Sequence, residues 1–222
     1  MKLYENKEIQ IEKFISGGLS NNSYLISNTS TNECLIIDVP DNPRELINKT
    51  PRNKFDKTLN QEKIKIAITH GHYDHIEGLD LLSERLGPLD LYIGFADANY
   101  LNYPGTVIRL KNQNEINITN IDINLIYTPG HTEGSVCYFI DLDEKKFLFS
   151  GDTLFPGGPG KTIDSQNFKK IYESIKNKLY TLPKETIVMP GHGDSTTIKD
   201  SLEEFKEFDF KNNVFGDISW KN

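Results

Sequence analysis

The sequence predicts an α/β fold in which sheets are covered by layers of helices. Two groups of short strand-like segments occur along the chain, and each group is followed by segments with helical spacing. Elements in this order are typical of sheets that each bury one face against helices. Hydrophobic residues make up 36% and charged residues 26% of the 222 residues, which is typical of a globular chain. We therefore predict one domain over residues 1–222.

The first group of strands fills the N-terminal part of the chain. Its segments are rich in β-branched residues and are separated by Gly, Asn, Ser and Thr, as consecutive strands are. Apolar residues then recur at helical spacing from Ile76 to Leu86 and stop at Gly87-Pro88, which predicts a helix ending there. The predicted strands are 9–15, 22–27, 34–39 and 63–69, with a short helix near 44–48.

The second group of strands is followed by two more helices. Asp164 or Ser165 is expected to cap a helix from Ser165 to Leu179, which carries an apolar stripe, and a last helix is predicted from Ser201 to Phe208. The Gly- and Pro-rich segment 155–160 is predicted to be a loop without regular structure. The predicted strands are 89–94, 115–120, 121–128, 135–142, 145–150 and 186–189.

Composition excludes several classes of partner. The formal net charge of −7 disfavours nucleic-acid binding, which needs clustered Lys and Arg. No apolar run approaches the roughly 20 residues of a membrane helix, and the N-terminus lacks the apolar core of a signal peptide, so we expect a cytoplasmic protein. Cys34 and Cys137 lie inside apolar runs and are expected to be buried free thiols.

All five histidines of the chain lie in short loops at the ends of apolar segments. Three occur in "THGHYDH", and the others end "TPGH" and "MPGH". Asp152 follows the apolar run "FLFSG" in the same way. Any one of these residues could be a solvated loop residue, and Asp74 alone could be a helix N-cap. Because every histidine shares this placement, a metal site explains the pattern better.

The spacing within the first motif favours a site for two ions. His70 and His72 are two residues apart, so in an extended segment both side chains face one ion. Asp74 and His75 follow where the chain enters a helix, and they can reach a second ion. Two more histidines and an aspartate from other loops would complete the sites. Three terminal ligands per ion and one shared carboxylate leave an open position on each, which marks catalytic rather than structural sites.

These motifs resemble those of the metallo-β-lactamase fold. "THGHYDH" is similar to the H-x-H-x-D-H signature of that family, and "TPGHTEGS", "SGDTLF" and "MPGHG" resemble its later motifs in the same order. "LIIDV" resembles its early strand. The resemblance covers nearly all of residues 10–195. It implies an αβ/βα four-layer sandwich with a dinuclear metal site at one edge of its two sheets.

The resemblance also implies a ligand set. His70, His72 and His131 would hold the first ion, and Asp74, His75 and His192 the second. Asp152 would bridge the two ions, and Asp38 would fix a ligand imidazole by accepting its outer N–H. Two divalent ions are thus implied as cofactors. Zinc is the expected metal, and iron and manganese suit the same ligands.

Within the fold, "GDTLFPGGPGKT" resembles glyoxalase II. Lys161 matches a lysine that holds the glutathione part of the substrate in that family. Pro159, Ile163 and Asp194 differ from the glyoxalase II pattern, and a separate C-terminal helical domain is not expected. We therefore expect a glyoxalase II-like hydrolase of a small thioester or ester with an anionic group, rather than one restricted to glutathione.

In the expected mechanism, a hydroxide shared by the two ions attacks the substrate carbonyl. Asp74 and Asp152 would be the catalytic carboxylates, and Asp74 would orient the hydroxide and take its proton. Lys161 would attract the anionic group of the substrate. Tyr73 points away from the metals by alternation, so it either lines the substrate pocket or packs beneath it.

Three alternatives remain open from the sequence. A persulfide dioxygenase of the same fold keeps these histidines around one iron ion. A lactonase or β-lactamase-like hydrolase would differ only in its pocket loops. A non-catalytic metal-binding scaffold would retain metal without activity. The sequence makes no prediction of oligomeric state.

Overall fold

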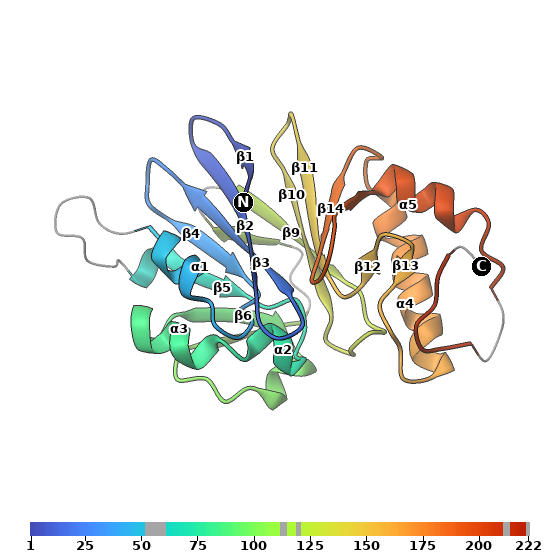
Figure 1. Ribbon diagram of the computed structural model, residues 1–222, viewed down its shortest axis with the longest axis horizontal. Helices are drawn as coiled ribbons and strands as arrows, with labels where there is room; N and C mark the ends of the chain where they lie inside the picture. Colours follow the sequence, from blue (N-terminus) through green and yellow to red (C-terminus); the bar gives the residue numbers. More distant parts are fainter. Residues whose placement is uncertain (52–60, 112–114, 119–120, 211–213, 221–222) are drawn as a thin grey trace.

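The computed structural model describes residues 1–51, 61–111, 115–118, 121–210 and 214–220 (Figure 1). Its first sheet contains the strands β1 to β7 in chain order. Neighbouring strands are antiparallel from β1 to β4 and parallel from β4 to β7. The strands are β1 (Lys2–Glu5), β2 (Ile9–Ser16), β3 (Asn21–Asn28), β4 (Cys34–Ile37), β5 (Ile64–Ala67), β6 (Asp90–Gly94) and β7 (Val107–Leu110).

The second sheet has the strand order β15-β14-β11-β10-β9-β8. Its neighbours are antiparallel except for β11 and β14, which are parallel. A small hairpin of β12 (Leu154–Phe155) and β13 (Gly158–Pro159) stands apart. The strands of the sheet are β8 (Glu115–Ile118), β9 (Ile121–Tyr127), β10 (Val136–Asp141), β11 (Lys146–Gly151), β14 (Ile187–Pro190) and β15 (Thr196–Thr197).

Helices cover the outer face of each sheet, so the molecule has four layers (Figure 1). The first sheet is covered by α1 (Arg44–Lys49), α2 (Tyr73–Ile76) and α3 (Leu79–Leu86). The second is covered by α4 (Ser165–Asn177) and α5 (Ile198–Phe205). The predicted αβ/βα sandwich is confirmed. No helix in the described ranges is long and apolar enough to cross a membrane.

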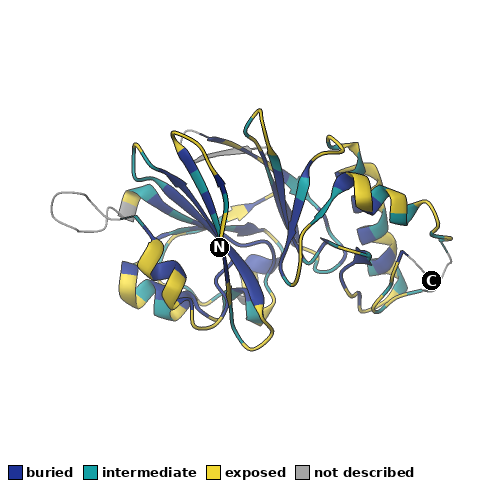
Figure 2. Cartoon of the chain, turned by 45° about the horizontal axis from the view of Figure 1, so that its top comes forward, coloured by how far each residue is buried: buried dark blue, intermediate teal, exposed yellow. Residues whose placement is uncertain are grey.

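The alternation of side chains along the central strands separates three apolar cores. In β4, Leu35 and Ile37 face the other sheet, whereas Cys34 and Ile36 face the helices α1 and α3. All four side chains are fully buried. Burial on both faces explains why this strand is a continuous apolar run in the sequence, and Figure 2 shows the buried residues concentrated in both sheets.

The two thiols are buried in different layers. Cys34 lies between the first sheet and its helices, and Cys137 lies between the second sheet and α4. Both are free and fully buried, as the sequence predicts. Burial raises the pKa of Cys34 to about 12 and that of Cys137 to about 11.

Several boundaries differ from the sequence predictions. The segment predicted to be a loop at 155–160 contains the β12–β13 hairpin, and β1, β7 and β15 were not predicted. The helix predicted from Ile76 to Leu86 is divided, because the N–H of Gly78 donates to the Val39 carbonyl at 2.9 Å instead of continuing the helix. The last helix begins at Ile198, where the Thr197 side chain accepts the N–H of Asp200 at 3.0 Å.

Candidate metal centre

The polar residues predicted for the site meet at one edge of the two sheets. Because β4 and β5 are parallel neighbours, as are β11 and β14, the loops at their carboxyl ends lie at the same edge. The β9–β10 loop joins them there. The structure brings together all five histidines with two aspartates: His70, His72, Asp74, His75, His131, Asp152 and His192.

Three histidines form the first cluster. Nδ1 of His72 lies 3.1 Å from Nε2 of His70 and 2.9 Å from Nε2 of His131. The three ring planes are steeply inclined to one another, with interplanar angles between 79° and 84°. Three ring nitrogens therefore converge from different directions on one point, as they do around a metal ion.

A second cluster consists of Asp74, His75 and His192. Oδ2 of Asp74 lies 3.2 Å from Nε2 of His192 and 3.7 Å from Nε2 of His75. The ligand atoms of this group all lie within 4.8 Å of one another. One carboxylate and two imidazoles form a second set of donors suited to a divalent transition metal.

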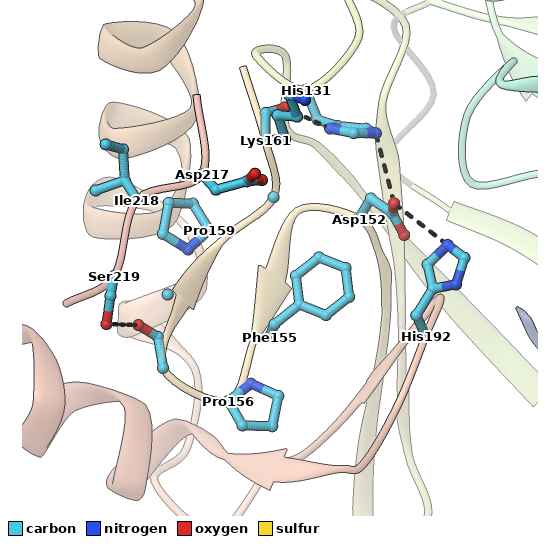
Figure 3. A pocket seen from close by; sticks show the side chains of 13 residues that line it. His131, Asp152, Phe155, Pro156, Pro159, Lys161, His192, Asp217, Ile218 and Ser219 are labelled. Carbon is cyan, nitrogen blue, oxygen red and sulfur yellow. Dashed lines mark hydrogen bonds and ion pairs between the residues drawn. The ribbon is translucent and has the colours of Figure 1, made fainter. Parts of the chain in front are cut away.

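Asp152 lies between the two clusters. Its Oδ2 is 3.6 Å from Nε2 of both His131 and His192 (Figure 3). Its Oδ1 is 3.4 Å from Nε2 of His75. The carboxylate thus contacts histidines of both clusters. This is the geometry required of a ligand shared by two ions.

The outer nitrogens of the two partly exposed histidines face backbone carbonyls. Nδ1 of His131 lies 2.7 Å from the Lys161 oxygen, and Nδ1 of His192 lies 3.2 Å from the Leu19 oxygen. A carbonyl only accepts, so each Nδ1 carries the proton and donates it. The Nε2 lone pair of each ring is left to face the cluster, which is the tautomer that metal binding requires.

Asp38 and Thr69 hold the two buried histidines in the same way. Oδ2 of Asp38 accepts Nδ1–H of His75 at 2.8 Å, and it also accepts the Thr69 hydroxyl at 2.7 Å. Since that hydroxyl donates to Asp38, it accepts from Nδ1 of His70 at 3.1 Å. Asp38 has a left-handed backbone with φ of 56°, a conformation that costs energy for a residue with a side chain. From that position its carboxylate accepts hydrogen bonds from both Thr69 and His75.

The electrostatics of the centre favour a cation. Burial and the neighbouring imidazoles hold the pKa of His70 well below its ordinary value. Burial alone would also lower the pKa of His75, but the Asp38 and Asp152 carboxylates outweigh it and raise that pKa to about 10. The pKa of Asp152 is lowered despite burial, because the imidazoles of His75, His131 and His192 lie close to its carboxylate. The carboxylates therefore attract positive charge into this site.

Two buried ligand atoms lack a hydrogen-bond partner among the residues that the structure describes. They are Nε2 of His75 and Oδ1 of Asp152. A buried polar atom without a partner costs about 1–3 kcal/mol, so such atoms in a native fold call for an explanation. The two atoms lie 3.4 Å apart in a group of side chains, with His70, that could hold a metal ion, and such an ion would satisfy both. The donor set and its unpaired atoms thus fit a pair of divalent ions.

The sequence analysis missed two polar residues at this edge. Nδ2 of Asn21 donates to Oδ2 of Asp74 at 2.8 Å, and Asn21 is fully buried. Asp97 is also buried and bonds to the loops that carry the first cluster. In the sequence Asn21 immediately precedes the predicted strand 22–27 and resembles an ordinary turn residue. Asp97, by contrast, follows the apolar strand "LYIG" as the ligand residues follow theirs, so the same pattern could have found it.

A cavity of about 440 Å³ adjoins the centre at Asp152, His131 and His192 (Figure 3). The β12–β13 hairpin and residues 217–219 of the C-terminal segment form its opposite wall. Lys161 and Asp217 place charged side chains at this cavity. Tyr73 is 64% exposed, so it does not pack beneath the site, and it does not line this cavity.

Comparison with known proteins identifies the family. Residues 16–192 match the family described as the metallo-beta-lactamase superfamily. The chain belongs to this superfamily. A probable metallo-hydrolase of Bacillus subtilis, YqgX, is 30% identical over 82% of this chain and 89% of that protein. A probable hydroxyacylglutathione hydrolase of Schizosaccharomyces pombe is 29% identical over 79% of this chain and 65% of its own length.

Solved structures of the superfamily share this fold. The B3 metallo-beta-lactamase BLEG-1 has a TM-score of 0.71 and 26% identity, and it covers 87% of this chain and 96% of its own. The protein TTHA1623, crystallised in a di-iron-bound form, has a TM-score of 0.63 and 26% identity over 86% of this chain and 96% of its own. The motifs, the clusters and these relatives together indicate a metallo-hydrolase of the superfamily.

Proposed function

We propose that the chain is a dinuclear metal-dependent hydrolase of small thioester or ester substrates, similar to glyoxalase II. The observation that carries this proposal is the position of Asp152 between two clusters, each with three further donor side chains. His70, His72 and His131 would hold one ion, and Asp74, His75 and His192 the other. Fewer than four terminal protein ligands per ion leave room for water and substrate.

When bound, two divalent ions would supply Lewis-acid chemistry that lowers the pKa of a water towards about 7 and polarises the substrate carbonyl. The residues of this chain orient the reactants. Burial alone would raise the pKa of Asp74, but the neighbouring His192 imidazole, the hydrogen bond from Asn21 and the charge of His75 outweigh it and keep that pKa low. Asp74 therefore stays ionised, with one oxygen fixed by Asn21, and can accept a hydrogen bond from the attacking water.

Lys161 would bind the anionic part of the substrate. Its backbone oxygen holds His131, and its side chain lines the cavity of about 440 Å³ (Figure 3). A substrate whose reacting carbonyl lies at Asp152 would extend along this cavity within reach of an ammonium group. The similarity to a probable hydroxyacylglutathione hydrolase supports a thioester. We propose zinc as the native metal, with iron as the alternative that the di-iron relative favours.

The test combines metal analysis of the purified protein with turnover of S-lactoylglutathione. We expect about two ions per chain and cleavage of the thioester. His72→Ala should bind one ion fewer and lose nearly all activity, because Nδ1 of His72 lies at the convergence point of the first cluster. Glu77→Ala, an exposed change close by in sequence, is the matched control and should retain both ions and full activity. Full activity of His72→Ala would refute the ligand assignment.

Hydrolysis of β-lactams is a second candidate, favoured by the structural similarity to a B3 metallo-beta-lactamase. The same purified protein can be assayed with a chromogenic cephalosporin beside the thioester. Turnover of the β-lactam at a much higher kcat/KM than that of the thioester would replace the first candidate with this one.

A further inference from the structure

Asp97 is a buried carboxylate close to the metal centre. It is the first residue of a short 3-10 helix, Asp97–Tyr100, which follows β6. Only 4% of its surface is exposed. A buried carboxylate is costly unless its oxygens accept hydrogen bonds, so its partners explain why it is tolerated there.

Those partners come from the loops of two different sheets. Oδ2 of Asp97 accepts the N–H of Gly71 at 2.8 Å and the hydroxyl of Thr132 at 2.7 Å. Oδ1 accepts the N–H of Gly134 at 2.9 Å. Gly71 belongs to the loop after β5, and Thr132 and Gly134 belong to the loop between β9 and β10. One carboxylate therefore joins the two loops across the edge of the sandwich.

The backbone fits closely around this carboxylate. A Cβ added to Gly71 would lie 3.0 Å from Cβ of Asp97, and one added to Gly134 would lie 2.5 Å from its carboxylate. The approach at position 134 requires glycine, and at position 71 a side chain would be tight against Asp97. Two of the three donors to the Asp97 carboxylate are thus backbone N–H groups, one from each loop.

Both loops carry histidines of the first cluster. Gly71 lies between His70 and His72 in the sequence, and Thr132 follows His131. Nδ1 of His72 and Nε2 of His131 are 2.9 Å apart, so a shift of either loop would separate donors that must grip one ion. Groups that orient metal ligands typically change metal affinity by about 10–100-fold when they are removed.

We infer that Asp97 is a positioning residue that fixes the separation of the two loops holding the first metal ion. The inference rests on the proposed metal centre. Asp97 also lines a second cavity, of about 620 Å³, together with His72 and His131. Its oxygens already accept three donors from the protein, however, so its role is to hold the loops rather than to bind substrate.

Asp97→Asn tests this inference with little change of shape. The amide offers one accepting oxygen where the carboxylate has two, so it places an NH₂ group against an N–H donor of one loop. We expect the affinity for one of the two ions to fall by about 10–100-fold, as measured by competition with graded chelators. We also expect kcat to fall by a larger factor than the factor by which KM changes. Asp80→Asn removes an exposed carboxylate from α3 and should leave metal affinity unchanged.

A second pair of variants decides the question if Asp97→Asn does not fold. Thr132→Val removes one donor to Asp97, whereas Thr132→Ser keeps a hydroxyl at the same place. Thr132→Val should weaken the same ion by about 10-fold, and Thr132→Ser should restore wild-type affinity. Equal affinity in the valine and serine variants would overturn the inference, as would wild-type affinity in a folded Asp97→Asn.

The outcomes also separate this inference from the proposed function. A wild-type chain that binds no metal would refute the metal centre and the role of Asp97 with it. Two tightly bound ions without thioester cleavage would refute only the proposed substrate. Two ions held equally well by the wild type and by Asp97→Asn would refute only the positioning role.

Discussion

At the scale of single residues, the chemistry of the centre depends on groups that face away from it. Four histidines present Nε2 to the clusters because their Nδ1 atoms face acceptors, two of which are backbone carbonyls. Lys161 has two roles in our proposal, because its backbone positions a metal ligand and its side chain binds the substrate. Its carbonyl holds His131, while its side chain lines the cavity in which we propose that the substrate binds.

Lys161→Ala separates these two roles, because it keeps the backbone oxygen and removes only the ammonium group. We expect KM for S-lactoylglutathione to rise by about 5–20-fold, the loss of about 1–2 kcal/mol from one charged contact, while kcat changes little. Lys169→Ala, on the exposed face of α4, is the control and should leave KM unchanged. A KM equal to that of the wild type would show that the substrate does not contact Lys161.

The ligand residues could be found from the sequence because histidine is rare in this chain. All five histidines follow apolar runs, and that coincidence is stronger than any one of them. The sequence signal for Asn21 and Asp97 is weaker than that for the histidines, since Asn and Asp are common in turns for reasons unrelated to metals. Their importance comes from contacts with residues 53 and 26 positions away along the chain, which local patterns do not encode.

At the scale of elements, α4 supports the loop that carries His131. The hydroxyl of Ser174 donates to the Pro129 carbonyl at 3.1 Å, and a Cβ on Gly130 would lie 2.4 Å from the Ile171 backbone nitrogen. Gly130 has a φ of 145° and leaves no space for a side chain. The position of the loop therefore depends on the middle and C-terminal half of α4, where Ile171 and Ser174 lie.

Asp164→Ala tests the cap of that helix. Oδ1 of Asp164 accepts the N–H of Asn167 at 2.7 Å, and loss of such a cap typically costs about 0.5–2 kcal/mol. We expect the urea midpoint to fall accordingly, with an unchanged m-value. Asp164→Asn keeps an accepting oxygen and should lie close to the wild type. Equal midpoints for the alanine and asparagine variants would show that the cap contributes nothing.

The positions of most elements followed from periodicity, whereas their ends often did not. The Asp164 cap was visible in the sequence, so the start of α4 at Ser165 was predicted correctly, whereas the helix ends two residues before the predicted Leu179. The cap at Thr197 was overlooked, and α5 begins three residues before its predicted start. The hairpin at β12 and β13 depends on its packing against the C-terminal segment, where the N–H of Trp220 donates to the Gly157 carbonyl at 2.7 Å.

At the scale of the whole molecule, the metal centre joins the two halves of the sandwich. His70, His72 and His75 follow the first sheet, and His131, Asp152 and His192 belong to the second. The four-layer arrangement was predictable, because the order of strands and helices and the family motifs agree. The identity of the substrate was not, because it depends on cavity walls from segments distant in the sequence.

Removing the metals should therefore lower the stability of the whole fold. An ion whose free concentration is 100 times its Kd stabilises the native state by about 2.7 kcal/mol. Each kcal/mol corresponds to a change of about 2–4 °C in Tm for a chain of this size. We expect a chelator to lower Tm by about 5–11 °C, measured by differential scanning fluorimetry. His72→Ala should show a smaller decrease. A Tm insensitive to the chelator in the wild type would contradict metal binding across the sheets.

The burial of both native thiols has a practical consequence for labelling experiments. Cys34 and Cys137 lie inside separate apolar layers with raised pKa values, so neither offers a reactive thiolate near neutral pH. A single cysteine introduced at an exposed position such as Ile163, which is 76% exposed and borders the larger cavity, would be the preferred target of a maleimide dye. Fluorescence from that one site could report ligand entry without removal of any natural residue that packs the core.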